Sequence, residues 1–195
     1  MCGIFLELFA ELGIPLSAQE YFDELAGLSD PEIIRVWLGQ DHPARESVLA
    51  ERIRRYQALV SDGSTVPESV RAAVCYAAER VPVLVVSGAL REEIVPVLEA
   101  AGLAGLLKAI VSYDDVTDAK PSPEGYLRAL ELLDDGVAAS DVLALEDTEA
   151  GITAAKSAGM RCIALLGTLV PERLAAADEI VPTLDVALMT RVLAG

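Results

Sequence analysis

The stretch Val142–Gly159, which reads VLALEDTEAGITAAKSAG, decides the fold. Its first four residues are an apolar run, typical in length of a buried strand and too short for a buried helix. Two adjacent carboxylates, Glu146 and Asp147, follow this run directly, and the next residues open a helix that ends at Gly159. A strand that passes through two acids into a helix places both carboxylates at the carboxyl edge of a sheet, where open α/β sheets bind their ligands.

The paired acids predict a cation site, because two neighbouring carboxylates repel each other. A hard divalent ion such as Mg²⁺ prefers oxygen ligands, so Glu146 and Asp147 are the expected metal ligands. The alternative is purely structural, since acidic residues at the start of a helix interact favourably with its dipole. We favour the metal site.

Composition limits the class of protein. The 195 residues suffice for one sizeable core with a smaller lobe. A net charge of −16 argues against nucleic acid as a partner, but not against a small phosphorylated metabolite, which a local cation or metal would hold. No apolar run is long enough to cross a membrane, and the acidic start lacks the positive charge of a signal peptide, so we expect a cytoplasmic protein. The unpaired spacing of Cys2, Cys75 and Cys162 predicts reduced thiols in ordinary packing.

The N-terminal third of the chain predicts helices only. A first helix carries Phe5, Leu8, Phe9 and Leu12 on one face. Capping-box patterns begin two further helices, and a longer helix follows. These three helices are predicted over residues 18–25, 29–39 and 43–61. Residues 1–63 are therefore predicted to form an all-α lobe.

From residue 64 onward the pattern alternates between strands and helices. The strands are predicted over residues 81–86, 109–112, 142–145, 161–165 and 179–181. Helices are predicted between them, with a short one over residues 170–176 and a closing one over residues 186–193. This alternation indicates right-handed βαβ units, so residues 64–195 are predicted to form an α/β core around a parallel sheet.

Two further polar groups follow strands or lie in loops at the same predicted edge. Ser87 and Gly88 come directly after the strand at 81–86 and precede a helix, which is a favourable place for a phosphate. A simple helix cap is the structural alternative. Lys120 lies in a loop that two prolines make rigid, where it would offer a fixed positive charge to a phosphoryl oxygen. Its alternative is an ordinary solvated lysine.

Taken together, these motifs resemble the haloacid dehalogenase superfamily, and within it the β-phosphoglucomutase-like phosphatases with an α-helical cap. The residues that carry the resemblance are VVSGA (85–89), DDVTDAKPSPEGYLRAL (114–130), LALEDTEAGITAAKSAGM (143–160) and, for the cap, LFAELGIPLSAQEYFDELAGLSD (8–30). The resemblance covers nearly the whole chain. It implies a Rossmann-like parallel sheet with an all-α cap.

The resemblance also implies a set of roles. Ser87 and Gly88 would bind the transferring phosphate, Lys120 would stabilise it, and Glu146 and Asp147 would hold Mg²⁺. The implied chemistry is phosphoryl transfer through an aspartyl-phosphate intermediate.

One feature of the family is missing from the sequence. The family opens with a buried strand that ends in Asp-x-Asp-Gly and carries the nucleophile, whereas only Met1-Cys-Gly precedes the first helix here. We therefore expect this chain to be inactive as a hydrolase. Since that strand lies between those ending at Val86 and Leu145, these two are expected to pair directly, to leave backbone groups unsatisfied, or to borrow a strand in a homo-oligomer.

Two short segments are weaker candidates for a nucleophile. Asp62-Gly63-Ser64-Thr65 has part of the missing pattern, but it follows a predicted helix and is better explained by turn chemistry. Met1-Cys-Gly-Ile resembles the start of N-terminal-cysteine amidotransferases, whose fold needs strands where this chain predicts a helix.

Three functions follow from this pattern. The first is a Mg²⁺-dependent phosphatase of a small phosphate ester. The second is a sugar phosphate mutase of the β-phosphoglucomutase type, which we rank lower because such enzymes carry a basic residue in the cap loop, and residues 25–30 have none. The third is a non-catalytic protein that binds phosphate or regulates another protein.

Overall fold

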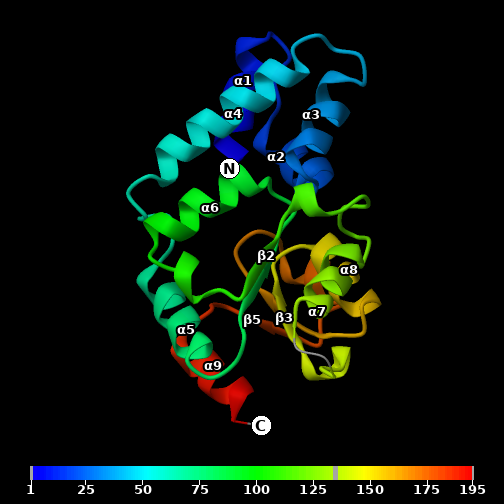
Figure 1. The fold of residues 1–195 in the computed structure, drawn as a ribbon. Helices are drawn as coiled ribbons and strands as arrows, with labels where there is room; N and C mark the ends of the chain where they lie inside the picture. Colours follow the sequence, from blue (N-terminus) through cyan, green and yellow to red (C-terminus); the bar gives the residue numbers. More distant parts are fainter. Residues whose placement is uncertain (1, 134–135, 195) are drawn as a thin grey trace.

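Two parallel β-sheets lie at the centre of the structure, a computed structural model that describes residues 2–133 and 136–194 (Figure 1). The strands are β1 (Leu84–Val86), β2 (Ala109–Val111), β3 (Leu143–Glu146), β4 (Arg161–Leu165) and β5 (Glu179–Val181). β1 pairs with β2, and the other three pair in the order β3, β4, β5. Every pairing is parallel, as the alternation of strands and helices predicts. The α/β fold class is therefore confirmed.

Helices cover both faces of the strands. They are α5 (Glu68–Ala78), α6 (Arg91–Ala100), α7 (Glu124–Glu131), α8 (Glu149–Ser157) and α9 (Val186–Leu193). α5 and α9 pack together on one face, while α7 and α8 lie on the other (Figure 1). Single turns of 3-10 helix complete the core: η2 (Ala104–Leu106), η3 (Tyr113–Asp115), η4 (Ala139–Asp141) and η5 (Pro171–Leu174).

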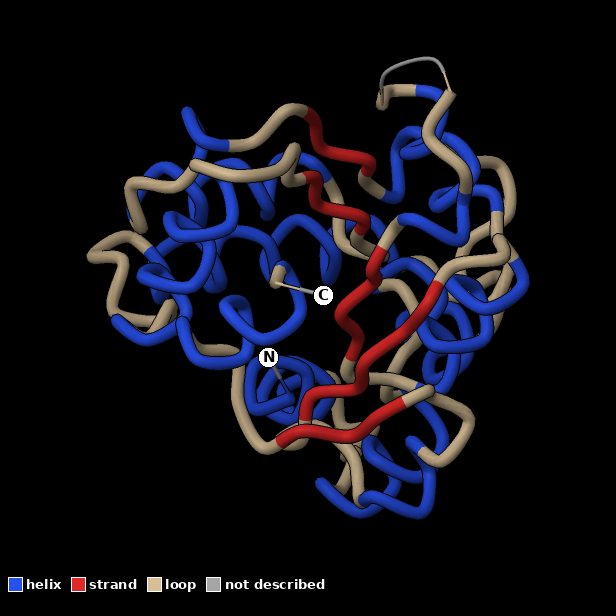
Figure 2. The backbone as a smooth tube through the Cα atoms, turned by 90° about the horizontal axis from the view of Figure 1, so that it is seen from below, coloured by secondary structure: helices blue, strands red, loops and turns tan. Residues whose placement is uncertain are grey.

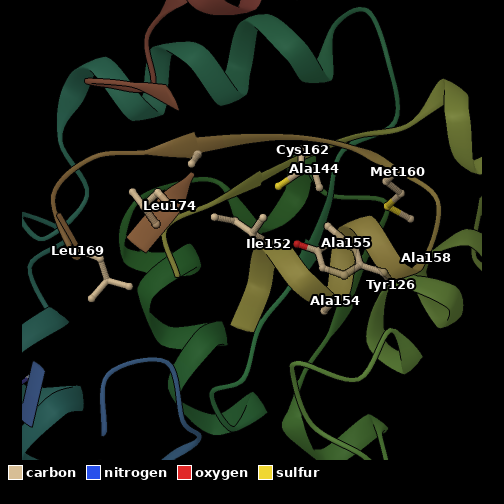
Figure 3. Packing of buried hydrophobic residues seen from close by; sticks show 11 residues of the cluster. Tyr126, Ala144, Ile152, Ala154, Ala155, Ala158, Met160, Cys162, Leu169 and Leu174 are labelled. Atoms are coloured by element: carbon tan, nitrogen blue, oxygen red, sulfur yellow. The ribbon is translucent and has the colours of Figure 1, made fainter. Parts of the chain in front are cut away.

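Small and aliphatic side chains fill the space between these layers. On the α7 and α8 side, Ile152 and Ala155 of α8 pack against Ala144 and Cys162 of the sheet (Figure 3). On the other face, buried residues of α5 and α9 pack against Ile163 of β4. A strand buried on both faces is expected to be apolar throughout, which explains the continuous apolar run of β4 after its first residue.

The two sheets do not join through β1 and β3. No strand pairs with the edge of β1 opposite β2, or with the edge of β3 opposite β4, in the part of the chain that the structure describes. The strands accordingly form two groups (Figure 2). Leu84, Val85 and Val86 all remain partly exposed, as expected of a strand with an open edge. Of the expected outcomes, direct pairing of these two strands does not occur.

The cap consists of α1 (Cys2–Glu11), α2 (Ala18–Glu20), α3 (Asp30–Leu38) and α4 (Arg45–Val60) around its own apolar cluster (Figure 1). Phe5, Leu8 and Phe9 are buried in this cluster as predicted, whereas Leu12 is exposed because α1 ends at Glu11. The helix predicted over residues 18–25 is only partly α-helical. After one turn, begun by the predicted capping box of Ser17 and Glu20, it continues as the π-helical turn η1 (Tyr21–Leu25).

An arginine lies buried on the inner face of α4. The Arg52 guanidinium forms ion pairs with Asp30, through Nε at 2.6 Å, and with Glu93 of α6. It also lies over the ring of Tyr56, 4.7 Å from the ring centroid. Burial raises the pKa of Asp30, although the charge of Arg52 acts in the opposite direction. Removing one partner of such a buried pair typically costs about 3–5 kcal/mol, so this cluster fixes α3 and α4 of the cap against α6 of the core.

Two general expectations can be compared with the structure. None of its described helices combines the length and the apolar character needed to cross a membrane. Cys2, Cys75 and Cys162 are free thiols. Burial raises the pKa of Cys162 to about 12, which is typical of a cysteine that serves in packing.

Candidate active site

A lysine and a glutamate meet where β1 and β3 end. Glu146 is the last residue of β3, and its side chain is 6% exposed. Lys120 Nζ donates to Glu146 Oε1 at 2.5 Å and to the carbonyl oxygen of Val86, the last residue of β1, at 2.9 Å. The ammonium group therefore links the carboxyl ends of two strands that do not pair. The structure brings Lys120 and Glu146 together, as the common sheet edge predicts, and the lysine is not simply solvated.

A tyrosine from α7 completes this cluster. The hydroxyl of Tyr126 donates to the same oxygen, Glu146 Oε1, and the Lys120 ammonium lies 5.2 Å from the centre of the Tyr126 ring. Burial, reinforced by the negative charge of Glu146, raises the pKa of Tyr126 far above its usual value. The hydroxyl consequently keeps its proton and acts as a donor.

Gly151 leaves room for the Glu146 carboxylate. A Cβ atom at this position of α8 would overlap both carboxylate oxygens of Glu146. The neighbouring turn is fixed by Thr148, whose side chain caps α8 by accepting a hydrogen bond from the Gly151 N–H at 3.1 Å. The glycine is therefore required by the close approach of a buried carboxylate to the helix backbone.

Asp147 lies beside this cluster and has a different partner. Its side chain is exposed, and its Oδ2 accepts a hydrogen bond of 2.5 Å from Thr168 Oγ1 in the loop after β4. The two adjacent acids are thus held by separate groups. Over residues 2–133 and 136–194, no three His, Cys, Asp or Glu side chains come together in a metal-binding arrangement. The carboxylates of Glu146 and Asp147 nevertheless suit Mg²⁺, a hard ion that usually keeps several water ligands.

Ser87 and Gly88 lie next to Lys120. These three residues line a cavity of about 20 Å³ between the ends of β1 and β2 and the loop that carries Lys120. Ser87 Oγ accepts a hydrogen bond from the backbone N–H of Ala89 at 3.1 Å, and the Ser87 N–H donates to Val111 of β2. Ser87 therefore makes a local turn contact, as a serine with a purely structural role would. It also faces the cavity beside Lys120.

The two weaker candidates for a nucleophile have structural explanations. Asp62 follows α4, not a strand, and its Oδ1 accepts from the Ser64 N–H at 2.9 Å. Its hydrogen bonds with Ser64 lower the pKa of Asp62, as is usual in such turns. Cys2 begins α1, and burial raises the pKa of its thiol, which disfavours the reactive thiolate.

Sequence reasoning did not assign a role to Tyr126, Gly151 or Thr168. Tyr126 and Gly151 both lie within the motifs that were recognised, but the contacts of their side chains depend on how α7 and α8 pack. A glycine in the first turn of a helix is unfavourable by propensity, and that is the one signal that pointed to Gly151. Nothing in the local pattern indicates Thr168.

Comparison with known proteins places this site in a family. Residues 1–165 match the family described as haloacid dehalogenase-like hydrolase. The chain belongs to this family. It is 40% identical over 105 residues to validoxylamine A 7'-phosphate phosphatase of Streptomyces hygroscopicus subsp. limoneus, covering 54% of this chain and 48% of that protein. The chain thus spans about half the length of this relative. Hexitol phosphatase B of Escherichia coli (strain K12) is 28% identical over 162 residues, covering 81% of this chain and 72% of that protein.

Solved structures confirm the fold. CbbY from Rhodobacter sphaeroides, solved in complex with phosphate, superimposes with a TM-score of 0.79 and 26% identity, covering 94% of this chain and 86% of that one. The β-phosphoglucomutase from Clostridium difficile has a TM-score of 0.77 at 18% identity, covering 98% and 88%. The second likeness concerns the fold alone.

The contact between Gly151 and Glu146 gives a first prediction. An alanine in place of a helical glycine usually stabilises a protein by about 0.5–1 kcal/mol. In Gly151→Ala the new methyl group would instead displace the Glu146 carboxylate, and we expect a loss of about 1–3 kcal/mol in the free energy of unfolding, as in overpacked cores. Urea denaturation measures the difference. Gly105→Ala, where a Cβ meets no atom within 4 Å, serves as the control. An equal or higher stability of Gly151→Ala would contradict the close approach.

Proposed function

We propose that the chain takes part in Mg²⁺-dependent hydrolysis of a small phosphate ester. The observation that carries the proposal is the position of Lys120, whose ammonium group lies beside Ser87 and Gly88 and pairs with Glu146 at the end of β3. A fixed cation beside backbone N–H groups is suited to phosphoryl oxygens. The names of the relatives support the same substrate class, since they include a validoxylamine phosphate phosphatase, a hexitol phosphatase and a phosphoglycolate phosphatase.

In this proposal the acidic pair holds the metal ion. Asp147 is accessible and Glu146 is adjacent, so both would bind Mg²⁺ together with water. The bound ion would neutralise charge on the phosphoryl oxygens. Thr168 and Gly151 would keep the two carboxylates in their different orientations, while Lys120 and Ser87 would bind the phosphate itself. The free cysteines agree with the reducing environment of the cytoplasm, where we propose that the protein acts.

Binding can be tested without turnover. We expect phosphate together with Mg²⁺ to raise the melting temperature of the wild-type protein, because ligands that bind only the folded state stabilise it. Lys120→Ala removes the phosphate-binding cation, and Asp147→Asn removes a metal ligand, so both should lose most of this increase. Lys156→Ala, which removes only a surface ion pair with Asp178, is the control. The same increase in Lys120→Ala as in wild type would overturn the phosphate site.

We propose that the chain by itself binds phosphate but does not hydrolyse phosphate esters. In its described residues, no third carboxylate joins Glu146 and Asp147 as a candidate to attack a phosphorus atom. Loss of a nucleophile costs several orders of magnitude in rate. We therefore expect the 195-residue chain with Mg²⁺ to show no turnover of an aryl phosphate above a Glu146→Ala/Asp147→Ala blank. Activity that is well above this blank and follows the protein through purification would show that an attacking group is present.

Two alternative functions would use the same site. A non-catalytic phosphate-binding protein would pass the binding test and show no turnover in any form of the protein. A mutase is less favoured, because the cap loop over residues 25–30 contains no lysine or arginine.

The open strand edges suggest a homo-oligomer as the form in solution. β1 and β3 each leave one edge without a partner among the described strands, and such edges readily pair with strands of other chains. We expect light scattering to give a mass above the 20.6 kDa of one chain, rising with protein concentration. A mass of one chain at every concentration would exclude this form.

A further inference from the structure

One positive and two negative side chains are buried together at the junction of cap and core. Arg52 of α4 forms ion pairs with Asp30, the first residue of α3, and with Glu93 of α6. The side chains of Arg52, Asp30 and Glu93 are 0%, 6% and 1% exposed. Neither acid pairs with a second cation in the part of the chain that the structure describes. The fully ionised cluster would therefore carry an excess negative charge that is shielded from water.

An uncompensated charge in such a place is unfavourable. Moving an ionised carboxylate from water into a protein interior costs far more than moving the neutral acid. When two carboxylates share one site, one of them consequently gives up its charge by binding a proton. With one proton the cluster would be neutral, since Arg52 would then balance a single carboxylate. Charge balance thus favours a proton on one of the two acids.

The contacts of the two acids indicate which one takes the proton. Both lie in the first turn of a helix, so the helix dipole does not distinguish them. Glu93 Oε2 accepts a hydrogen bond from the Leu90 N–H at 3.1 Å, which favours the charged form of Glu93. Asp30 Oδ2 is buried, and among the described residues its polar contact is with Arg52. Burial raises the pKa of Asp30, although Arg52 and the amino terminus of the chain oppose this effect. Asp30 is therefore the acid that holds the proton.

The other titratable groups near Asp30 do not supply the missing positive charge. Glu32 lies on the same helix and is itself an acid. Tyr21 of η1 and Tyr56 of α4 are partners from the neighbouring elements, and burial raises the pKa of both, that of Tyr21 to about 12. Both tyrosines consequently stay neutral between about pH 5 and 8. Over this range the charge of the cluster depends on Asp30 and the groups that pair with Arg52.

We propose that Asp30 binds a proton when the chain folds, and that this proton stabilises the junction of cap and core. In the unfolded chain Asp30 has its ordinary pKa of 3.8, so above this pH only the folded protein holds the proton. The free energy of unfolding then falls as the pH rises, until the folded protein loses the proton as well. Paired carboxylates usually act in the opposite sense, because their stabilisation is lost as the pH falls. The junction is thus a pH-sensitive device, and it does not depend on the proposed function.

Urea denaturation of the whole chain between about pH 5 and 8 tests this proposal. Asp30→Asn is neutral at every pH, as the protonated acid is. We expect the unfolding equilibrium constant of wild type, divided by that of Asp30→Asn, to rise with pH by up to about tenfold per pH unit. Asp41→Asn changes the net charge equally at an exposed position of the cap, so it should keep the pH dependence of wild type. A ratio of wild type to Asp30→Asn that is constant over this range would overturn the proposal.

A second variant and a direct titration identify the group. In Glu93→Gln a single acid remains for Arg52, so Asp30 should stay ionised and the extra pH dependence should disappear. Carbon-13 NMR of the wild-type chain labelled at its aspartate carboxyl groups follows the proton itself. We expect the resonance that is missing in Asp30→Asn to titrate at a higher pH than those of exposed aspartates. A midpoint equal to theirs would refute the role of Asp30. No phosphate or Mg²⁺ is added, so a failure of either to bind would leave these results unaffected.

Discussion

The ion pair between Lys120 and Glu146 is the interaction on which the centre of the molecule depends. It lies where two separate parallel sheets end, and the lysine also binds the carbonyl group of Val86 on the other sheet. A buried carboxylate without partners is strongly unfavourable. Here the ammonium group and the hydroxyl of Tyr126 both donate to Glu146 Oε1, and Gly151 leaves space for the carboxylate. The contacts that stabilise this buried carboxylate also connect the two sheets, which share no strand pairing among the described residues.

Much of this arrangement follows from local sequence patterns. The glutamate at the end of β3 and the serine after β1 each follow from the strand pattern, and Lys120 contacts the last residues of both strands. The lysine was harder to place, since its loop follows no strand directly. The two prolines around it predict a fixed positive charge, but only the structure reveals its contact with Glu146.

The contacts that the sequence did not reveal involve partners that are distant in the chain. Arg52 is buried on α4, although nothing in the local sequence indicates a buried charge at this position. It is accommodated because Asp30 and Glu93, from two other helices, surround it. The π-helical turn η1 is likewise not evident from the sequence. Helical periodicity over residues 18–25 does not distinguish it from an α-helix, and its Phe22 carbonyl is bound by Arg173, far along the chain.

The open edges of β1 and β3 lie next to the candidate site. Both strands belong to parallel sheets, and the last residue of each contacts Lys120, Val86 through its carbonyl group and Glu146 through its carboxylate. A strand that paired with both open edges and ended level with these residues would therefore end beside the lysine. Such a strand would satisfy the free backbone groups of both edges and bury the half-exposed side chains of β1. It would also change which groups compete for the ammonium of Lys120. A segment that completed the sheet would therefore also alter the surroundings of Lys120, so strand pairing and phosphate binding should be measured on the same sample.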